Sequence, residues 1–519
     1  MSLFRNTLSV GGLTLISRIF GFIRDALIAA VLGIGPVADA FQAAFRFPNL
    51  FRRLFAEGAF NTAFVPMFSG ALETRGNAEA INLAGRIMSW LVAAILVVTV
   101  LAEIFMPQIM AVFVPGFIDD PEKFALTVFL SRIMFPYLAC MSLMAAYGAI
   151  LNSLGKFVAA AFAPVLLNIV NIAVLVPLAF LSLEQADTAF WLGIAAMAGG
   201  VAQLALVFVA IRRSGFMPAI GWPRLNADVR RFWVLAVPAI AAGGIIQINV
   251  FVGTVIASQA DNAIAIIANA DRLYQLPLGI IGIAIGTVLL PELSRHLSAG
   301  REAEARAGQS QAILLSMTLT LPAATALVAI GVPIVRVLFE RGAFDAAATI
   351  AVSEALAGFA IGLPAFVLVR VLQPGFFSRA DTRTPTLLAG LSMVVNVVVS
   401  LALFPSLEHI GIALATSISA WVNVVLLALL LGRRGHFRPS RAETGSLAGI
   451  LAVAVAMGLL LWGLAGWAAP IFAPGAAFAL QFVCLAGLVG LGAMLYFATL
   501  HFTGLQRLDA ILARLRRRH

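Results

Sequence analysis

Residues 45–66 read FRFPNLFRRLFAEGAFNTAFVP and place Arg46, Arg52, Arg53 and Glu57 among phenylalanine, leucine and alanine side chains. The chain as a whole is poor in charge, since 61% of its 519 residues are hydrophobic and only 11% are charged. An apolar segment that carries three arginines and a glutamate needs an explanation, and that explanation depends on what surrounds the segment.

The composition indicates a polytopic membrane protein. Mean hydropathy is +1.01, and apolar runs recur at lengths near the roughly 20 residues that cross a bilayer as a helix. The runs are continuous rather than alternating, so a transmembrane barrel does not fit. Arg18 and Arg24 interrupt the apolar N-terminal stretch and no small-residue cleavage site follows, so we expect a retained first helix rather than a signal peptide.

We predict an all-α polytopic membrane protein with about fourteen transmembrane helices. The predicted spans cover residues 7–32, 38–68, 86–113, 123–152, 158–181, 188–211, 232–258, 264–295, 309–335, 347–377, 384–404, 409–432, 445–468 and 476–502.

Loop charge predicts the orientation of these spans. With the N-terminus in the cytoplasm, almost all loop lysines and arginines fall on the cytoplasmic side, and only Lys123, Arg336 and Arg341 fall on the other. Because short cytoplasmic loops are enriched in lysine and arginine, we expect both termini in the cytoplasm. The basic tail at 505–519 fits either a topology anchor or a site for lipid head groups or a partner.

An internal repeat divides the chain. The segment with Asp39, Pro48 and Pro66 resembles the segment with Asp271, Pro277 and Pro291. A second pair of similar segments, which contain the asparagines at positions 171 and 396, is separated by nearly the same number of residues as the first pair. Copies that start on the same side imply two six-helix lobes in parallel repeat. We therefore predict an N-lobe at 1–214, a C-lobe at 215–435, and two extra helices with the basic tail at 436–519.

Several arginines remain inside the predicted spans after the loops are assigned: Arg18, Arg24, Arg46, Arg52, Arg53, Arg132, Arg272 and Arg370. A charge near the centre of a bilayer costs about 2.5–3.5 kcal/mol on insertion scales, so these side chains must pair, line water or reach the interface. Most lie in the first two spans, and if the lobes meet there they form one cationic cavity. Arginine in such a cavity suits phosphate, because its guanidinium donates bidentate hydrogen bonds.

Ion pairs within the helices are the alternative. At 100° per residue, Arg18 and Asp25 lie about 20° apart on one helix face, as do Asp39 and Arg46. Arg53 and Glu57 form an i, i+4 pair, and for Arg46, Arg132 and Glu103 we favour a structural role. By contrast, Arg24 and Arg52 each lie about 100° from a charged neighbour, which makes them the better ligand candidates.

Other chemistry finds no support in the sequence. The five histidines and two cysteines have no metal-ligand spacing, no phosphate-binding loop of the GxxxxGK[ST] type occurs, and no basic face interleaves with aromatics. We therefore expect no cofactor, no metal and no nucleic-acid partner. An enzyme acting on lipid-linked precursors would need a large loop with catalytic groups, and the longest gap between predicted spans is short, so we expect a protein that is not an enzyme.

Segments along nearly the whole chain resemble the MurJ/MviN family of lipid II flippases in bacterial inner membranes, which belongs to the multidrug, oligosaccharidyl-lipid and polysaccharide exporter superfamily. They are SRIFGFIRDALIAAVLG (17–33), ADAFQAAFRFPNLFRRLFAEGAFNTAFVP (38–66), PGFIDDPEKFALT (115–127), GAILNS (148–153), FAPVLLNI (162–169), ADRLYQLPLGIIGIAIGTVLLPELS (270–294) and QPGFFSRADTRTP (373–385).

The resemblance implies alternating-access transport of undecaprenyl-pyrophosphoryl-MurNAc-pentapeptide-GlcNAc from the cytoplasmic to the periplasmic leaflet, for peptidoglycan synthesis. It implies lipid II, membrane lipids, and cell-wall synthesis and division proteins as partners. It also implies substrate-binding roles for Arg18, Arg24, Asp39, Arg52 and Arg272, and a gating or ion-pair role for Arg53 and Glu57.

Two positions depart from the family pattern. Gln275 stands where relatives often carry glutamate, which puts in doubt any proton or ion role there, whereas Arg370 replaces a common lysine and keeps the charge. The alternatives are an exporter of another polyprenyl-linked oligosaccharide and a drug or cation antiporter of the same superfamily. The antiporter would need acids rather than arginines to attract its substrate.

Overall fold

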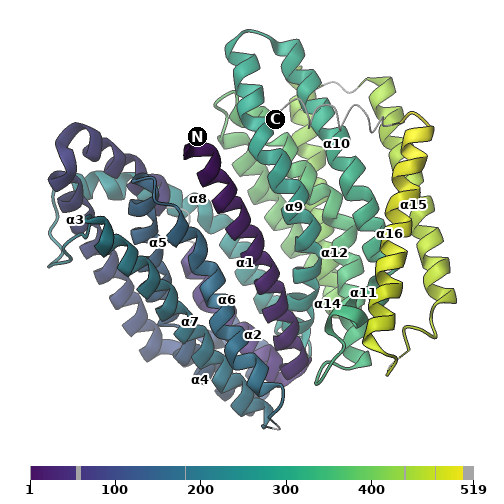
Figure 1. Ribbon diagram of the computed structural model, residues 1–519, viewed down its shortest axis with the longest axis horizontal. Helices are drawn as coiled ribbons and strands as arrows, with labels where there is room; N and C mark the ends of the chain where they lie inside the picture. The colour runs from purple at the N-terminus through teal and green to yellow at the C-terminus, as the bar shows by residue number, and fades with distance from the viewer. Residues whose placement is uncertain (1, 54–59, 182, 438–439, 474, 506–519) are drawn as a thin grey trace. The chain divides into compact units, whose positions relative to one another are not determined.

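The computed structural model describes residues 2–53, 60–181, 183–437, 440–473 and 475–505, and within these ranges the chain is helical with no β-strand (Figure 1). The predicted all-α class is confirmed. The first helices are α1 (Ser2–Leu32), α2 (Pro36–Arg52), α3 (Phe60–Phe113), α4 (Pro121–Met134), α5 (Tyr137–Ser153), α6 (Val158–Leu178), α7 (Gln185–Ser214) and α8 (Ala227–Ala257). The others are α9 (Ala263–Ser298), α10 (Glu302–Ala329), α11 (Gly331–Phe339), α12 (Ala346–Leu372), α13 (Pro374–Phe377), α14 (Arg383–Arg433), α15 (Arg441–Trp467) and α16 (Phe478–Phe502).

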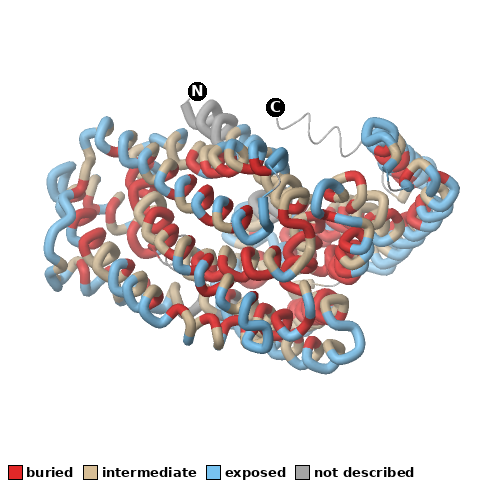
Figure 2. Tube along the Cα trace, turned by 90° about the horizontal axis from the view of Figure 1, so that it is seen from below, coloured by how far each residue is buried: buried red, intermediate tan, exposed pale blue. Residues whose placement is uncertain are grey.

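The helices have the length and the surface of membrane spans. Within the described residues, nine helical segments are long and apolar enough to cross a bilayer. Large apolar side chains point outward, such as Leu96 on α3, Leu387 on α14 and Val483 on α16, and exposed residues run along the outer sides of the helices (Figure 2). Lipid, rather than water, accommodates such surfaces. The chain is therefore a multi-pass membrane protein, and the total of fourteen spans stays a prediction.

Breaks in the helices separate some predicted spans and divide others. Non-helical backbone at Gly76 in α3 and at Glu408 in α14 falls in predicted loops, so each of these long helices contains residues of two predicted spans. The predicted span 123–152 corresponds to one apolar helical segment, Pro121–Ser153. It contains a turn between α4 and α5 at Pro136, which has no N–H to donate. Of the predicted span 38–68, the described residues belong to α2, which ends at Arg52, and to α3 from Phe60 onward; residues 54–59 lie outside the described ranges.

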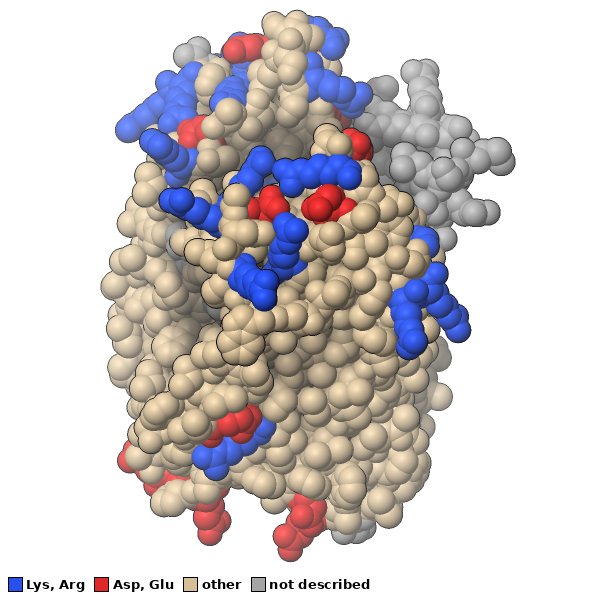
Figure 3. Space-filling model, turned by 90° about the vertical axis from the view of Figure 1, so that its left-hand side faces the viewer, with Lys and Arg blue, Asp and Glu red and all other residues tan. Residues whose placement is uncertain are grey.

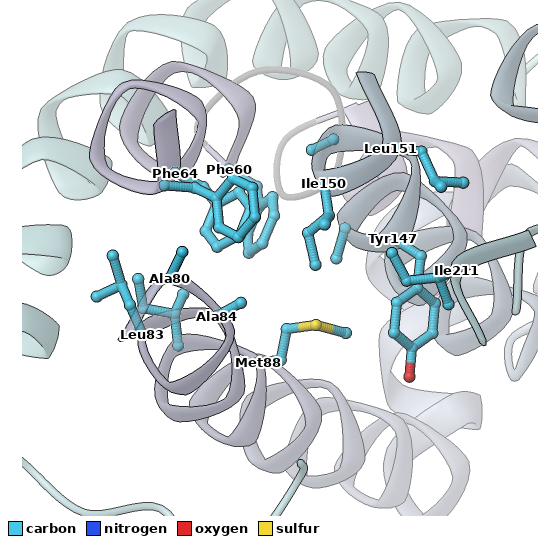
Figure 4. Close-up of a cluster of buried hydrophobic side chains, with 14 of the residues drawn as sticks. Phe60, Phe64, Ala80, Leu83, Ala84, Met88, Tyr147, Ile150, Leu151 and Ile211 are labelled. Carbon is cyan, nitrogen blue, oxygen red and sulfur yellow. The ribbon is translucent and has the colours of Figure 1, made fainter. Parts of the chain in front are cut away.

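The chain forms two compact units. Unit 1 comprises Met1–Ala265 together with Arg341–Phe344, and unit 2 comprises Ile266–Glu340 and Asp345–His519. In unit 1 a core joins α3, α5, α7 and α8, where Phe60 and Phe64 face Met88 and Ile150 (Figure 4). Between membrane helices such side chains stabilise the fold through close van der Waals packing. The sequence-based lobe boundary at 214/215 concerns the repeat and stays a prediction.

Unit 2 packs α12 against α10 and α14, and the hairpin of α15 and α16 against α10 and α11. Tyr496 on α16 is fully buried and its hydroxyl donates to the Thr318 carbonyl of α10 at 2.9 Å. Gly458 lets α15 approach Thr325, where a Cβ would lie only 3.2 Å from the threonine Cβ. The last two helices are thus firmly attached to unit 2 rather than peripheral to it.

Candidate functional site

Arg24 occupies the contact between α1 and α6. Its Nε and Nη2 donate to Asp25 Oδ1 at 3.0 and 2.7 Å, and its Nη1 donates to Asn168 Oδ1 at 2.9 Å. The Asn168 side-chain amide in turn donates to the Ser17 carbonyl at 3.0 Å, which fixes the orientation of that amide. A guanidinium carries five N–H groups, so these bonds leave two for a ligand.

The pairing differs from the expectation drawn from helix geometry. That geometry paired Asp25 with Arg18 and left Arg24 less easily paired, whereas in the structure Asp25 binds Arg24, the adjacent residue. Arg18 is half-buried and makes no ion pair with any residue in the described ranges. Arg18 therefore keeps its charge available in a segment where a charge is costly.

Arg52 ends α2, and its Nε donates to Asn49 Oδ1 at 3.0 Å. The Asn49 amide donates to the Phe45 carbonyl at 2.8 Å, so a chain of hydrogen bonds orients the arginine along its own helix. Arg53 follows as an exposed residue. Glu57, its predicted gating partner, lies outside the described residues, and the predicted pair remains a prediction.

Arg46 forms a hydrogen bond across helices. Its Nη1 donates to Thr254 Oγ1 of α8 at 3.2 Å. Asp39, the acid predicted to share its helix face, makes its short ion pair with Lys123 instead. The structural role that we favoured for Arg46 therefore involves α8 rather than α2 alone.

Asp39 and Lys123 form a buried ion pair at the end of unit 1 where α2 begins. The Asp39 side chain is completely buried, and Lys123 Nζ lies 2.8 Å from its Oδ2. The other oxygen, Oδ1, accepts the Ala265 backbone N–H at 2.7 Å. Lys123 Nζ also lies 3.9 Å from the centre of the Phe117 ring, where the cation meets the π face. Both carboxylate oxygens are therefore engaged by the protein.

Close backbone contacts seal the same end of unit 1. The Ala343 N–H donates to the Ala30 carbonyl at 2.7 Å, so residues 341–344 are bound to the end of α1. Gly33 and Gly342 have φ of +62° and +57°, and a Cβ at either one would overlap a carbonyl oxygen of the facing segment. Only glycine accommodates both the conformation and the contact.

A further segment closes over this end. The Gly116 N–H donates to Ser258 Oγ at 3.2 Å, and a Cβ on this glycine would overlap the Ser258 carbonyl. We call residues 33–39, 116–123, 258–265 and 341–344 together the sealed end of unit 1.

Unit 2 holds a second group of polar residues on α9 and α12. Asp271 accepts a short hydrogen bond from Gln275, one helical turn away, and Arg272 lies half-buried beside it. The Tyr274 ring stacks on Phe359 with centroids 4.9 Å apart. The Arg370 side chain packs against Gly282, where an added Cβ would lie 3.1 Å from the arginine Cδ and Nη1. Arg272 thus belongs to unit 2, whereas the other predicted arginine ligands belong to unit 1.

The sequence did not reveal Lys123 and Asn168 as site residues. Lys123 was counted only as an outer-loop charge, and its position three residues after the helix-capping Asp120 gave no sign that it turns inward. Asn168 lies in a segment that carries the family resemblance, and a buried amide within an apolar helix was the available signal. Neither partner was predictable, because 84 and 144 residues separate the bonded pairs.

Comparison with known proteins identifies the family. A family model described as "Lipid II flippase MurJ" matches residues 28–483. A "Probable lipid II flippase MurJ" of Rhizobium meliloti (strain 1021) is 46% identical over 499 residues, covering 96% of this chain and 93% of that protein. A "Lipid II flippase MurJ" of Burkholderia cenocepacia is 34% identical over 472 residues, covering 89% of this chain and 90% of that protein.

Solved structures support the fold. "Lipid II flippase MurJ, inward closed conformation" superposes with a TM-score of 0.77 at 22% identity, covering 96% of this chain and 99% of that one. An inward-facing multidrug resistance transporter of the MATE family, in the MOP superfamily, superposes with a TM-score of 0.66 at 13% identity, covering 83% of this chain and 98% of that one. With the family model spanning most of the sequence, the chain belongs to the lipid II flippase MurJ family.

Proposed function

We propose that this protein is a lipid II flippase, which moves the polyprenyl diphosphate-linked muropeptide from the cytoplasmic to the periplasmic leaflet of the bacterial inner membrane for peptidoglycan synthesis. The observation that carries the proposal is the set of arginines inside apolar helices. Arg24 in particular is held in place by Asp25 and Asn168 and still has two N–H groups to offer. A diphosphate is the anion that such donors suit.

In this proposal Arg18, Arg24, Arg52 and Arg272 bind the diphosphate of the head group. The first three belong to unit 1 and the last to unit 2, so a substrate that binds all four would respond to movement between the units. Arg53 and Glu57 are proposed to act as a gating pair. Asp39 is proposed to meet the head group only after the sealed end opens, because both of its oxygens are engaged in the present state.

Alternating access follows from the sealed end. Buried ion pairing at Asp39 and Lys123, together with glycine contacts at positions 33 and 342, closes one end of unit 1. With the termini in the cytoplasm, as loop charge favours, this end faces the periplasm. Release of the substrate to the periplasm would then require this end to open.

The test is to deplete the native flippase of a bacterial host, supply this chain, and measure lipid II exposed on the outer leaflet. Restored exposure is expected. A chain that inserts correctly but restores none would contradict the proposal. Liposomes that contain the purified protein separate the alternatives, because a flippase for lipid II should discriminate against other polyprenyl-linked oligosaccharides, and a cation antiporter should move none of them.

A further inference from the structure

An apolar groove runs between α3 and α8 on unit 1. Its walls carry no charged side chain and comprise Phe60, Leu91, Ala94, Ile95, Val98, Leu138, Phe232, Trp233, Ala236 and Ile240. Several of these residues, including Leu91 and Ala94, are only half-buried. The neighbouring Leu96 and Val234 are 61% and 66% exposed on the outer surface. The groove is therefore accessible from the surface of unit 1.

A basic rim stands at one end of this groove. Arg75 and Arg86 of α3 each lie 3.3 Å from Asp228, at the start of α8, with exposed arginine side chains. Arg224, Arg230 and Arg231 are exposed nearby in sequence, around Asp228. Two arginines thus contact Asp228, and three more lie within four residues of it in the sequence. Basic side chains gather on the upper part of this face of the molecule (Figure 3). Exposed ion pairs of this length contribute little, so the arginines remain able to bind another anion.

The loop between α7 and α8 belongs to the same basic rim and indicates where the rim lies relative to the bilayer. It is bound to α3 where the Gly221 N–H donates to Ser89 Oγ at 3.0 Å and where Trp90 Nε1 donates to the Arg224 carbonyl at 3.1 Å. The same loop presents Trp222, whose side chain is 85% exposed. Tryptophan concentrates at the level of lipid head groups, so the rim lies at the membrane interface and the groove begins just below it.

The geometry points to a binding site for one anionic glycerophospholipid, with its phosphate among Arg86, Arg230 and Arg231 and one acyl chain in the groove between α3 and α8. Along α3, Arg86 precedes Leu91 by five residues, or about 7.5 Å of helix. On α8, Arg231 directly precedes Phe232, which lines the groove. Along the helix axes these arginines therefore lie about 1.5 to 7.5 Å above the groove residues, within reach of the phosphate of a lipid whose acyl chain enters the groove.

A phospholipid fits better than the polyprenyl substrate. The phosphate end lies at the interface rather than among the half-buried arginines of α1 and α2, and the groove has no polar side chain for a sugar or a peptide. Basic pockets between helices on the cytoplasmic side are suited to anionic head groups. The inference uses the proposed orientation but not the proposed transport activity, so the two can fail separately.

The test measures lipid binding to the purified full-length protein by native mass spectrometry. Dioleoylphosphatidylglycerol and dioleoylphosphatidylcholine are titrated separately, because they share chains and differ in net charge. We expect one phosphatidylglycerol to bind in preference to phosphatidylcholine. We expect Arg230→Gln/Arg231→Gln to weaken that binding about tenfold or more, since each arginine near an anionic lipid contributes about 1 kcal/mol.

A matched pair of variants controls for charge. Arg212→Gln/Arg213→Gln removes two adjacent exposed arginines at the end of α7, which do not line the groove, and should change binding by less than about twofold. Ala94→Trp should lower binding by filling the groove while leaving the charge unchanged. Equal losses in the two arginine pairs, equal binding of both lipids, or tighter binding of a polyprenyl diphosphate at this site would each overturn the inference. If Ala94→Trp fails to fold, the two arginine pairs still decide.

Discussion

Lys123 Nζ lies 2.8 Å from Asp39 Oδ2, in a site where the aspartate is completely buried and the lysine nearly so. The two residues come from α4 and α2, and the second carboxylate oxygen binds the backbone at Ala265, near the start of α9. One carboxylate therefore ties together three segments that are distant in sequence. Separating these segments must break or move a buried ion pair, so the pair stabilises their packing.

Removing one charge of this pair should destabilise the sealed end strongly. In Asp39→Asn the buried Lys123 loses its counter-ion, and breaking such a pair costs about 3–5 kcal/mol. We expect a clearly lower thermal unfolding temperature in detergent. Lys123→Met should have a similar effect, and the double variant Asp39→Asn/Lys123→Met should be less destabilised than the sum of the two.

The neighbouring acid provides the control for this prediction. Glu122 is exposed, so Glu122→Gln removes one negative charge from the same helix end without touching a buried pair, and its unfolding temperature should stay near that of the wild type. Strict additivity in the double variant would show that Asp39 and Lys123 do not act on one another.

Gly342→Ala should release residues 341–344 from the end of α1. The left-handed backbone costs a non-glycine residue about 1–2 kcal/mol, and the new Cβ would overlap the Ala30 carbonyl oxygen. Hydrogen exchange of the Ala343 amide, which now donates to Ala30 at 2.7 Å, should become much faster. Gly35→Ala is the control, because its φ of 178° is open to any residue and no atom lies within 4 Å. Unchanged protection of Ala343 in Gly342→Ala would contradict the role assigned to the glycine.

Hydropathy and loop charge predicted the helical membrane fold and several breaks, because both signals are local. Long apolar runs must form helices in lipid, where each backbone N–H needs a partner within its own segment. The break at Glu408 lies in a loop that such runs left between two spans. The turn at Pro136 inside span 123–152 was not predicted, since a proline in a membrane helix is compatible with either a kink or a break.

The partners of the site residues were less predictable. Helix geometry places adjacent residues about 100° apart and therefore discounts them as pairs. The arginine side chain is nevertheless long enough to bend toward the next residue, so that Arg24 binds Asp25. The contacts from Arg24 to Asn168 and from Asp39 to Lys123 depend on tertiary packing between helices, which no local periodicity encodes.

Arg24→Ala should abolish lipid II flipping at equal amounts of membrane-inserted protein, because it removes the anchored guanidinium with its two remaining N–H groups. Asn168→Leu should reduce flipping by about tenfold, since it removes one hydrogen bond that orients Arg24 but keeps the charge. Arg24→Lys should rescue part of the activity if charge alone matters, and little of it if bidentate donation matters. The measurement is lipid II exposure in the depleted host, normalised to membrane-inserted protein. Full activity in Arg24→Ala would exclude this arginine as a phosphate ligand.

His436, in the turn between α14 and α15, should make stability depend on pH. Burial lowers the pKa of this histidine below 6.5, and the positive charge of Arg379 lowers it further. The unfolded chain then binds more protons than the folded chain, so stability should be full above pH 6.5 and decline as pH falls below it. The measurement is the thermal unfolding temperature between pH 7.5 and 5.5. His436→Gln should make this temperature fall less than it does in the wild type. Arg379→Gln should raise the pKa of His436 in an NMR titration, whereas Arg379→Lys, which keeps the charge, should leave it low; a pKa at or above 6.5 in the wild type would refute the prediction.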